Sequence, residues 1–245
     1  MSGDDTPQAG LPGVAVIVPV LNEARVLAAT LESVCCQSPE ELVVVDGGSG
    51  DGTPEVARAA LAAAGPGTRW TLMEASRGRA LQMNAGAAAS RSPVLLFLHG
   101  DTRLPEGGLE QVRRAVARGA LWGRFRLRLE DARPVYRLIE TTMEWRSRLS
   151  GIVTGDQTFF VRRDLFELMR GFPSQPLMED IAFSKRLNTV ARPVVIDATV
   201  LTAARRWQQG GVFRTVLQMW LLRALYALGV SPRRLAGHYR DLRES

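Results

Sequence analysis

The stretch Val14–Val20, with the sequence VAVIVPV, decides the fold class of this chain. A run of nonpolar residues without polar alternation indicates a strand that is buried on both faces. A segment with helical spacing of apolar residues follows over 22–37, and the next apolar run, ELVVVD, ends at Asp46. Strand and helix patterns then alternate up to a fourth apolar run before Gly100. This alternation predicts βαβ units and an α/β fold with a Rossmann-like, mostly parallel central sheet and helices on both faces.

The composition fits a globular protein with a sizeable core, because 46% of the 245 residues are hydrophobic. Lys and Arg number 31 against 25 Asp and Glu, which gives a formal net charge of +6. This excess favours an anionic partner such as a nucleotide or an anionic lipid surface, although a solvated basic surface has the same composition. Basic residues interleaved with aromatic residues do not form a stripe, so we expect no nucleic-acid partner.

The pattern predicts three parts of the chain. Residues 1–13 are polar and rich in Gly and Pro, without a basic start or an apolar signal core, which indicates a loose tail and a cytoplasmic protein. Residues 14–200 form the α/β domain, and residues 201–245 form a C-terminal helical extension. The adjacent Cys35 and Cys36 are interpreted as small buried hydrophobic residues in a reducing compartment.

Three carboxylates follow predicted strands. Glu23 comes after the first strand, Asp46 ends the second and Asp101 follows the fourth. Right-handed crossovers place the carboxyl ends of parallel strands along one edge of the sheet, where open α/β sheets bind ligands. We therefore expect one crevice in which a divalent cation, Mn or Mg, meets a phosphate ligand. Each carboxylate alone also fits an ordinary capping residue.

The glycines of DGGSGDGTPE follow the second strand and are not spaced as G-x-G-x-x-G, which argues against a dinucleotide site. Arg77 and Arg79, in SRGRA, stand at the start of the third predicted helix, where an anion is favoured. A solvated helix start is the alternative for these two residues.

Five segments occur in a characteristic order: VIVPVLNE, VVVDGGSGDGT, RGRALQMNAGAAAS, LHGDTRLP and GFPSQPLMEDIAFSKRL. Together they resemble the family-2 glycosyltransferases of the GT-A fold, over about Val14 to Val190. The short form of the chain is similar to a bacterial subgroup of small members. The resemblance implies transfer of a sugar from a nucleotide-sugar donor to an acceptor hydroxyl, with inversion and with a divalent cation.

The resemblance also implies roles on the donor side. Pro19, Glu23 and Asp46 would hold the nucleoside, and Asp101 would bind the metal. The family's D-x-D motif is His99-Gly100-Asp101 here, so a histidine replaces a carboxylate that usually contacts the sugar or ribose. As a ligand, an imidazole would favour manganese or another transition metal. The alternative is a satisfied, partly buried imidazole.

Glu179 and Asp180 precede a predicted helix. They fit an acidic helix start that the macrodipole stabilises, whereas the resemblance implies that Asp180 is the general base. It also places Glu179 on the acceptor or sugar side of the site. The segment SGIVTGDQTFFVRR resembles the acceptor mouth of the family, and its candidate contacts are Gly155, Asp156 and Gln157.

The segment TAARRW is similar to the Q-x-x-R-W motif of processive members, with Arg206 and Trp207 in place and Ala203 at the position of the Gln. That departure argues against a processive synthase. Arg206 would reach a phosphate and Trp207 would stack on an acceptor, or the segment is a capped loop with a packed Trp.

The last apolar segment, VFRTVLQMWLLRALYALGV, has helical spacing, but Arg214 and Arg223 interrupt it and make it a poor membrane span. It packs on the domain as a core helix, or it lies at the cytoplasmic face of a membrane with Arg233 and Arg234 near anionic head groups. The second alternative suits a lipid-linked or isoprenoid-like acceptor. The apolar positions are Phe213, Val216, Leu217, Trp220, Leu221, Ala224, Leu225 and Leu228.

Two other functions fit the same residues. A nucleotidyltransferase also brings carboxylates and a metal to a nucleotide, but it makes a nucleotide sugar and releases pyrophosphate. A degenerate, membrane-associated binding protein on the same fold would account for the histidine at position 99.

Overall fold

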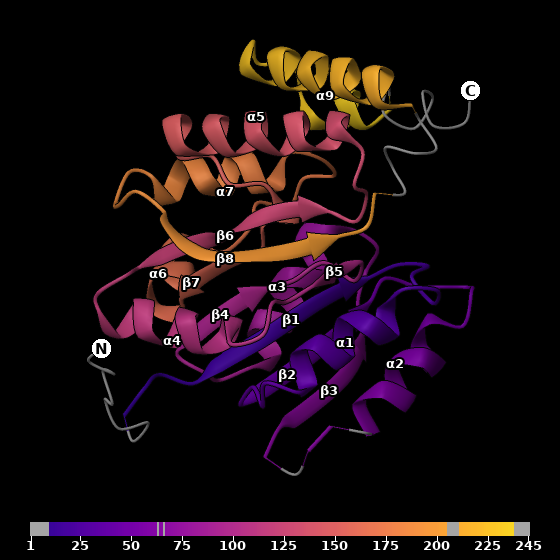
Figure 1. Cartoon of the computed structure of the whole chain (residues 1–245), viewed down its shortest axis with the longest axis vertical. Helices are drawn as coiled ribbons and strands as arrows, with labels where there is room; N and C mark the ends of the chain where they lie inside the picture. The colour runs from indigo at the N-terminus through magenta and orange to yellow at the C-terminus, as the bar shows by residue number, and fades with distance from the viewer. Residues whose placement is uncertain (1–9, 63, 66, 205–210, 238–245) are drawn as a thin grey trace.

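The computed structural model describes residues 10–62, 64–65, 67–204 and 211–237 (Figure 1). The first half of the described chain contains β1 (Val14–Val20), α1 (Leu27–Cys35), β2 (Glu41–Asp46), α2 (Thr53–Ala62), β3 (Arg69–Glu74), α3 (Arg79–Ala89) and β4 (Val94–Phe97). The second half contains β5 (Thr102–Arg103), α4 (Gly108–Ala117), β6 (Trp122–Leu129), α5 (Pro134–Ser150), η1 (Gly155–Gln157), β7 (Phe159–Arg162), α6 (Arg163–Leu168), α7 (Glu179–Leu187), β8 (Val194–Thr202) and α9 (Val212–Ala227).

The strands form one sheet in the order β3-β2-β1-β4-β7-β6-β8-β5. β1 pairs in parallel with β2 and β4, and β6 pairs in parallel with β8, whereas β7 is antiparallel to both of its neighbours. The chain runs outward from β1 to β3 and returns to the other side of β1 as β4. The predicted α/β class with a mostly parallel sheet is therefore confirmed.

β1 and β4 part at their carboxyl ends. Their pairing stops at Ile17 and Phe97, while the pairing of β1 with β2 continues to Val20 and Asp46. The strand order reverses at this point, and open α/β sheets bind ligands in the crevice at such a reversal. The fold thus positions the loops after β1, β2 and β4 around one crevice.

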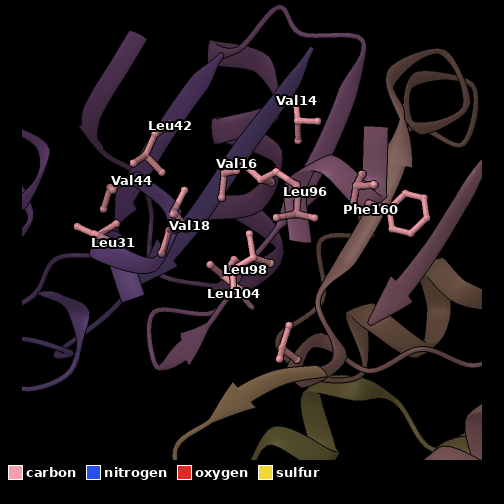
Figure 2. Packing of buried hydrophobic residues seen from close by; sticks show 14 of the residues in the cluster. Val14, Val16, Val18, Leu31, Leu42, Val44, Leu96, Leu98, Leu104 and Phe160 are labelled. Carbon is pink, nitrogen blue, oxygen red and sulfur yellow. The ribbon is translucent and has the colours of Figure 1, made fainter. Parts of the chain in front are cut away.

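The side chains of alternate β1 residues belong to two hydrophobic layers, one on each face of the sheet. Val14, Val16 and Val18 pack in the layer that contains residues of α1, α2 and α4. Figure 2 shows these three valines and Leu31 of α1. Ile17 points to the opposite layer, which contains residues of α3, α6 and α7. All seven residues of β1 are buried, which confirms the strand buried on both faces.

α3 packs directly on the strand ends. The Gln82 side-chain Nε2 donates to the backbone oxygens of Val20 and Val45, at 2.8 and 2.9 Å. A Cβ at Gly86 would lie 2.5 Å from Cγ2 of Ile17, so glycine is required for this approach. The segment QMNAGA therefore fixes the third helix against the two central strands.

Several element boundaries differ from the sequence prediction. α1 begins at Leu27, so Glu23 lies in the loop before it and not in its first turn. The physical reason is that residues 24–26 form a turn, in which the backbone oxygen of Glu23 accepts from the N–H groups of Val26 and Leu27 at 3.0 Å. The N–H of Glu23 donates to Thr53 Oγ1 at 2.8 Å. β8 continues to Thr202, and the short β5 was not predicted. Cys36 is exposed and Cys35 is half-buried, so the prediction of two buried thiols was wrong.

The C-terminal helix packs on the domain with Val216 and Leu225 of the predicted stripe and with Leu222, which was not predicted. α9 lies above α5 in Figure 1, and its buried contacts reach α7 through Leu222 and its neighbours. The core-helix alternative therefore describes one face of α9. The opposite face exposes Leu217 (71%), Trp220 (65%), Leu221 (54%) and Leu228 (82%). The boundary predicted at residue 200 stays a prediction.

Replacing Gly86 with Ala should lower the free energy of unfolding by about 1–2 kcal/mol, because overpacking outweighs the gain in helix propensity. The branched Ile17 side chain has little rotamer freedom with which to retreat. The matched control is Gly65→Ala, where a Cβ meets nothing within 4 Å. Urea unfolding midpoints measure the difference, and equal midpoints for the two variants would contradict the tight α3–β1 contact.

Candidate active site

Two loops form one wall of the crevice. Asn22 donates its backbone N–H to Ser49 Oγ at 2.9 Å, and its side-chain oxygen accepts from the N–H of Gly50 at 3.0 Å. These bonds join the loop after β1 to the loop after β2. Pro19 is buried at the end of β1, next to the wall.

The buried Asp46 carboxylate is directed into its own loop. Its Oδ2 accepts from the backbone N–H groups of Gly48 and Ser49, at 2.9 and 2.8 Å. Its Oδ1 accepts from the Ser49 hydroxyl at 2.5 Å. Asp46 therefore shapes the wall.

Asp101 lies on the other side of the crevice. The Cβ position of the preceding Gly100 is 3.4 Å from Cγ of Glu23, so the loops after β1 and β4 touch. The backbone oxygen of Asp101 accepts from the N–H of Ala203 at 3.0 Å. The end of β8 thus holds Asp101 in place.

The carboxylates that the sequence predicted in one crevice do not form a cluster of metal ligands. Among the described residues, no group of three or more His, Cys, Asp or Glu side chains could hold an ion. Within these residues, the hydrogen bond to the Asp101 carboxylate is a long one, 3.4 Å, from the Thr102 hydroxyl. A half-buried carboxylate with free lone pairs fits an ion such as Mg or Mn that is shared with substrate phosphates.

His99 is packed between two residues of η1. Its Nδ1 lies 3.2 Å from Oδ1 of Asp156. Its Nε2 is buried without a hydrogen-bond partner in the described part of the chain. A Cβ at Gly155 would lie 2.4 Å from Nε2, so glycine is required there. The contact with Asp156 gives Nδ1 a partner but leaves Nε2 without one, so the imidazole is only half satisfied.

Asp180, in the first turn of α7, is held by two backbone groups. Its Oδ2 accepts from the N–H of Gly155 at 3.0 Å, and its Oδ1 accepts from the N–H of Ile181 at 2.7 Å. A capping box formed by Thr154 and Gln157 fixes η1. Asp180 therefore keeps one orientation, with an oxygen available to a small cavity of about 60 Å³. The cavity is lined by Arg79, Thr154, Asp156, Leu177, Met178, Glu179, Asp180, Ile181, Met219 and Arg223.

A family comparison agrees with this geometry. The sequence model described as glycosyl transferase family 2 matches residues 15–175. The chain belongs to this family. The glycosyltransferase AglE of Haloferax volcanii is 36% identical over 105 residues, which cover 41% of this family-2 chain and 34% of that relative.

Solved structures show that the family-2 chain has the GT-A fold. S. aureus TarS in complex with UDP matches with a TM-score of 0.62 and 18% identity, over 78% of this chain and 60% of that one. The mannosyltransferase PcManGT of Pyrobaculum calidifontis, in complex with GDP-Man and Mn²⁺, matches with a TM-score of 0.65 and 22% identity. That match covers 97% of this chain and 73% of the other. The predicted fold and family are confirmed.

Glu179 of this family-2 site is almost completely buried beside Asp180. Burial raises the pKa of its carboxyl group above the usual range, against the attraction of Arg79 and with the repulsion of Asp180. The Arg79 Nε lies 3.6 Å from the Glu179 Oε1. Arg79 therefore lines the cavity. Arg77, for which the sequence predicted the same anion-binding role, is exposed and does not line the cavity.

Two arginines of the site were missed by sequence reasoning. Arg146 comes from α5 and Arg223 from α9. Burial lowers the pKa of Arg146 to about 10, and the neighbouring positive charge of Arg223 contributes. Burial also lowers the pKa of Arg223, against the attraction of Asp180 and Asp156. For Arg223, the sequence signal was a charged residue within an apolar helix, and we interpreted it only as evidence against a membrane span.

Arg206 and Trp207 lie outside the described residues. Their predicted contacts with a phosphate and an acceptor stay predictions.

Replacing Glu179 with Gln should change how stability depends on pH. A carboxyl group with a raised folded-state pKa binds more protons in the native chain, so the wild type loses stability as the pH rises above 4.5. The variant lacks this loss, and its stability relative to the wild type should increase with pH. The gain is about 1.4 kcal/mol for each pKa unit between the folded and unfolded chains.

Unfolding in urea from pH 4 to pH 8 measures this difference. The exposed Glu55→Gln variant on α2 is the control and should show no added pH dependence. A constant difference between Glu179→Gln and the wild type would contradict the raised pKa.

Proposed function

We propose that this chain is an inverting glycosyltransferase that moves a sugar from a nucleotide-sugar donor to an acceptor hydroxyl. The observation that carries the proposal is the Asp180 carboxylate, fixed by the N–H of Gly155 and facing a cavity beside the crevice of a family-2 chain. A carboxylate in this position suits a general base.

The donor would occupy the crevice. The nucleoside would be held by the wall that the loops after β1 and β2 form, which includes Pro19, Glu23 and Asp46. Asp101 would hold a divalent cation, Mn or Mg, which neutralises the charge that develops on the diphosphate when it leaves. Two similar proteins bind such ligands, since TarS was solved with UDP and PcManGT with GDP-Man and Mn²⁺.

The transfer step balances with one bond formed and one broken. The acceptor oxygen forms a bond to the anomeric carbon from the face opposite the diphosphate. The bond between that carbon and the diphosphate oxygen breaks, and its electron pair leaves with the nucleoside diphosphate. The acceptor proton passes to the Asp180 carboxylate. Gly155, Asp156 and Gln157 would border the acceptor, and Glu179, with its partner Arg79, would border the donor sugar.

Asp180→Asn should retain nucleotide binding and lose transfer, by about 10²–10⁴-fold, because the general base is lost.

Asp101→Asn should lose the metal-dependent part of nucleotide binding. Thermal unfolding with UDP or GDP, with and without Mn²⁺, measures binding, and release of the nucleoside diphosphate from UDP-sugars and GDP-sugars measures turnover. The control is Asp197→Asn on β8, whose carboxylate is 81% exposed.

The same measurements separate the other functions. Release of pyrophosphate from a nucleoside triphosphate and a sugar phosphate would identify a nucleotidyltransferase. Nucleotide binding without turnover would identify a degenerate binding protein. If no nucleotide raises the melting temperature, the donor site is wrong.

The outer face of α9 supports a peripheral contact with an anionic membrane at its cytoplasmic face. Four large apolar side chains on this face are exposed, and Arg233 and Arg234, which follow in the helix over 232–237, are exposed as well. A search of the described residues finds no helix that could cross a bilayer. An apolar stripe with neighbouring arginines is the pattern of an interfacial helix. A lipid-linked acceptor would be reached from this position.

Replacing Leu217, Trp220 and Leu221 together with Ser should reduce binding to vesicles of anionic lipid at least tenfold, because each apolar side chain contributes about 1.5–3 kcal/mol on burial. Co-sedimentation with anionic and zwitterionic vesicles measures the loss. The control is Leu168→Ser on α6, which is also highly exposed, at 70%. Equal binding of wild type, triple variant and control would exclude α9 as the contact.

A further inference from the structure

Arg223, on α9, lines the cavity beside Asp180, and Arg146, on α5, is near enough for the charges of Arg223 and Asp180 to act on it. We propose that they bind a phosphate group carried by the acceptor and thereby place the attacking hydroxyl beside Asp180. This inference rests on the proposed function and names the chemical class of the acceptor, a phosphate ester with a free hydroxyl.

The two guanidinium groups have donors to spare. The Nε and Nη2 atoms of Arg146 and the Nε atom of Arg223 are buried and have no hydrogen-bond partner among the described residues. The terminal nitrogens of Arg223 are not among these fully buried atoms, and Arg223 lines the cavity. Arg223 can therefore donate to an oxyanion in the cavity, whereas Arg146 does not line the cavity and would have to turn toward the ligand to use its donors.

The neighbouring carboxylates do not meet this need. Asp180 accepts from the N–H groups of Gly155 and Ile181. Asp156 lies against Nδ1 of His99. Asp180 forms no ion pair with Arg146 or Arg223 among the described residues, although both Asp180 and Asp156 influence the pKa of the two arginines. The arrangement keeps Asp180 free to accept a proton and keeps the arginines free for a ligand.

Two unpaired guanidinium groups near each other are unfavourable in a buried position. Burial and the charge of Arg223 both lower the pKa of Arg146. A phosphate would relieve both effects, because its oxygens accept paired N–H bonds from the planar guanidinium forks. Arg124 also has buried Nε and Nη2 atoms without a partner, but its charge is paired with Glu144 at 2.7 Å, whereas Arg146 and Arg223 have no ion pair among the described residues.

The cavity also restricts what the anion belongs to. Its volume of about 60 Å³ has room for a small group such as a phosphate. Asp101, the position predicted for the donor diphosphate, does not line it. Leu177, Met178 and Met219 form an apolar side of the cavity. The lining therefore fits an acceptor with a phosphate near an apolar part.

The test is phosphate binding by the full chain, first saturated with Mn²⁺ and the nucleoside diphosphate that binds it. The probes are inorganic phosphate and glycerol 3-phosphate, with glycerol and sodium chloride at equal ionic strength as controls. The melting temperature should rise with inorganic phosphate and with glycerol 3-phosphate, but not with glycerol or sodium chloride. Arg146→Gln and Arg223→Gln should each weaken the apparent phosphate affinity at least tenfold, and Arg223→Lys should weaken it less.

A matched control separates binding from folding. Arg58→Gln removes an exposed charge on α2 and should leave phosphate affinity unchanged. Without phosphate, Arg146→Gln and Arg223→Gln should melt no lower than the wild type, because each removes an unpaired buried charge. Lower melting temperatures together with unchanged phosphate affinity would assign the arginines a structural role and overturn the proposal.

Other outcomes also overturn it. Loss of the phosphate effect when the nucleoside diphosphate is bound would assign the arginines to the donor. Nucleotide binding without any phosphate effect would reject the acceptor phosphate and leave the proposed function intact. If no nucleoside diphosphate binds, the proposed function itself fails, and the acceptor assignment fails with it.

Vesicles distinguish the source of the phosphate. Those that contain phosphatidic acid carry a phosphate monoester on a lipid, and those that contain phosphatidylglycerol carry a diester. Stronger binding to the first, lost in Arg146→Gln and Arg223→Gln, would support a lipid-borne phosphate. An effect of the arginines on glycerol 3-phosphate alone would support a soluble phosphate ester.

Discussion

Complete burial of β1 between two helical layers is the constraint on which the rest of the structure depends. Because neither face of this strand meets solvent, polar groups are confined to the loops at its ends. The helix α3 must approach closely enough to seal one face, which requires glycine at position 86 against Ile17. β4 diverges from β1 after Ile17, and the crevice opens at that point. The position of the candidate site follows from the packing of one strand.

The candidate site joins segments that are far apart in the sequence. Gly155 has no side chain, which lets the His99 ring approach closely, and its backbone N–H donates to Asp180. It therefore links the loop after β4 to the start of α7. Ala203 adds the end of β8 through its bond to Asp101. A displacement of η1 would therefore disturb both the histidine and the proposed base.

The sequence allowed prediction of the sheet class and of most elements, because burial imposes a strict pattern on β1, β2 and β4. The predicted start of α1 was wrong, because apolar periodicity does not distinguish the turn over 24–26 from the first turn of a helix, and the bond that holds Glu23 to Thr53 joins residues 30 positions apart. The role of Arg223 was missed for a similar reason: a charge in an apolar helix acquires a partner or a ligand through tertiary packing, which periodicity does not report.

The two faces of α9 complement each other in the proposed reaction. One face directs Arg223 toward Asp180, and the opposite face exposes Trp220 and its apolar neighbours. A helix between a membrane surface and a reacting group would have to satisfy both environments, because lipid favours apolar side chains and a phosphate requires fixed donors. α9 meets both demands with two different faces. Arg223 is half-buried on the inner face among packed apolar residues such as Leu222, and Trp220 is exposed on the outer face.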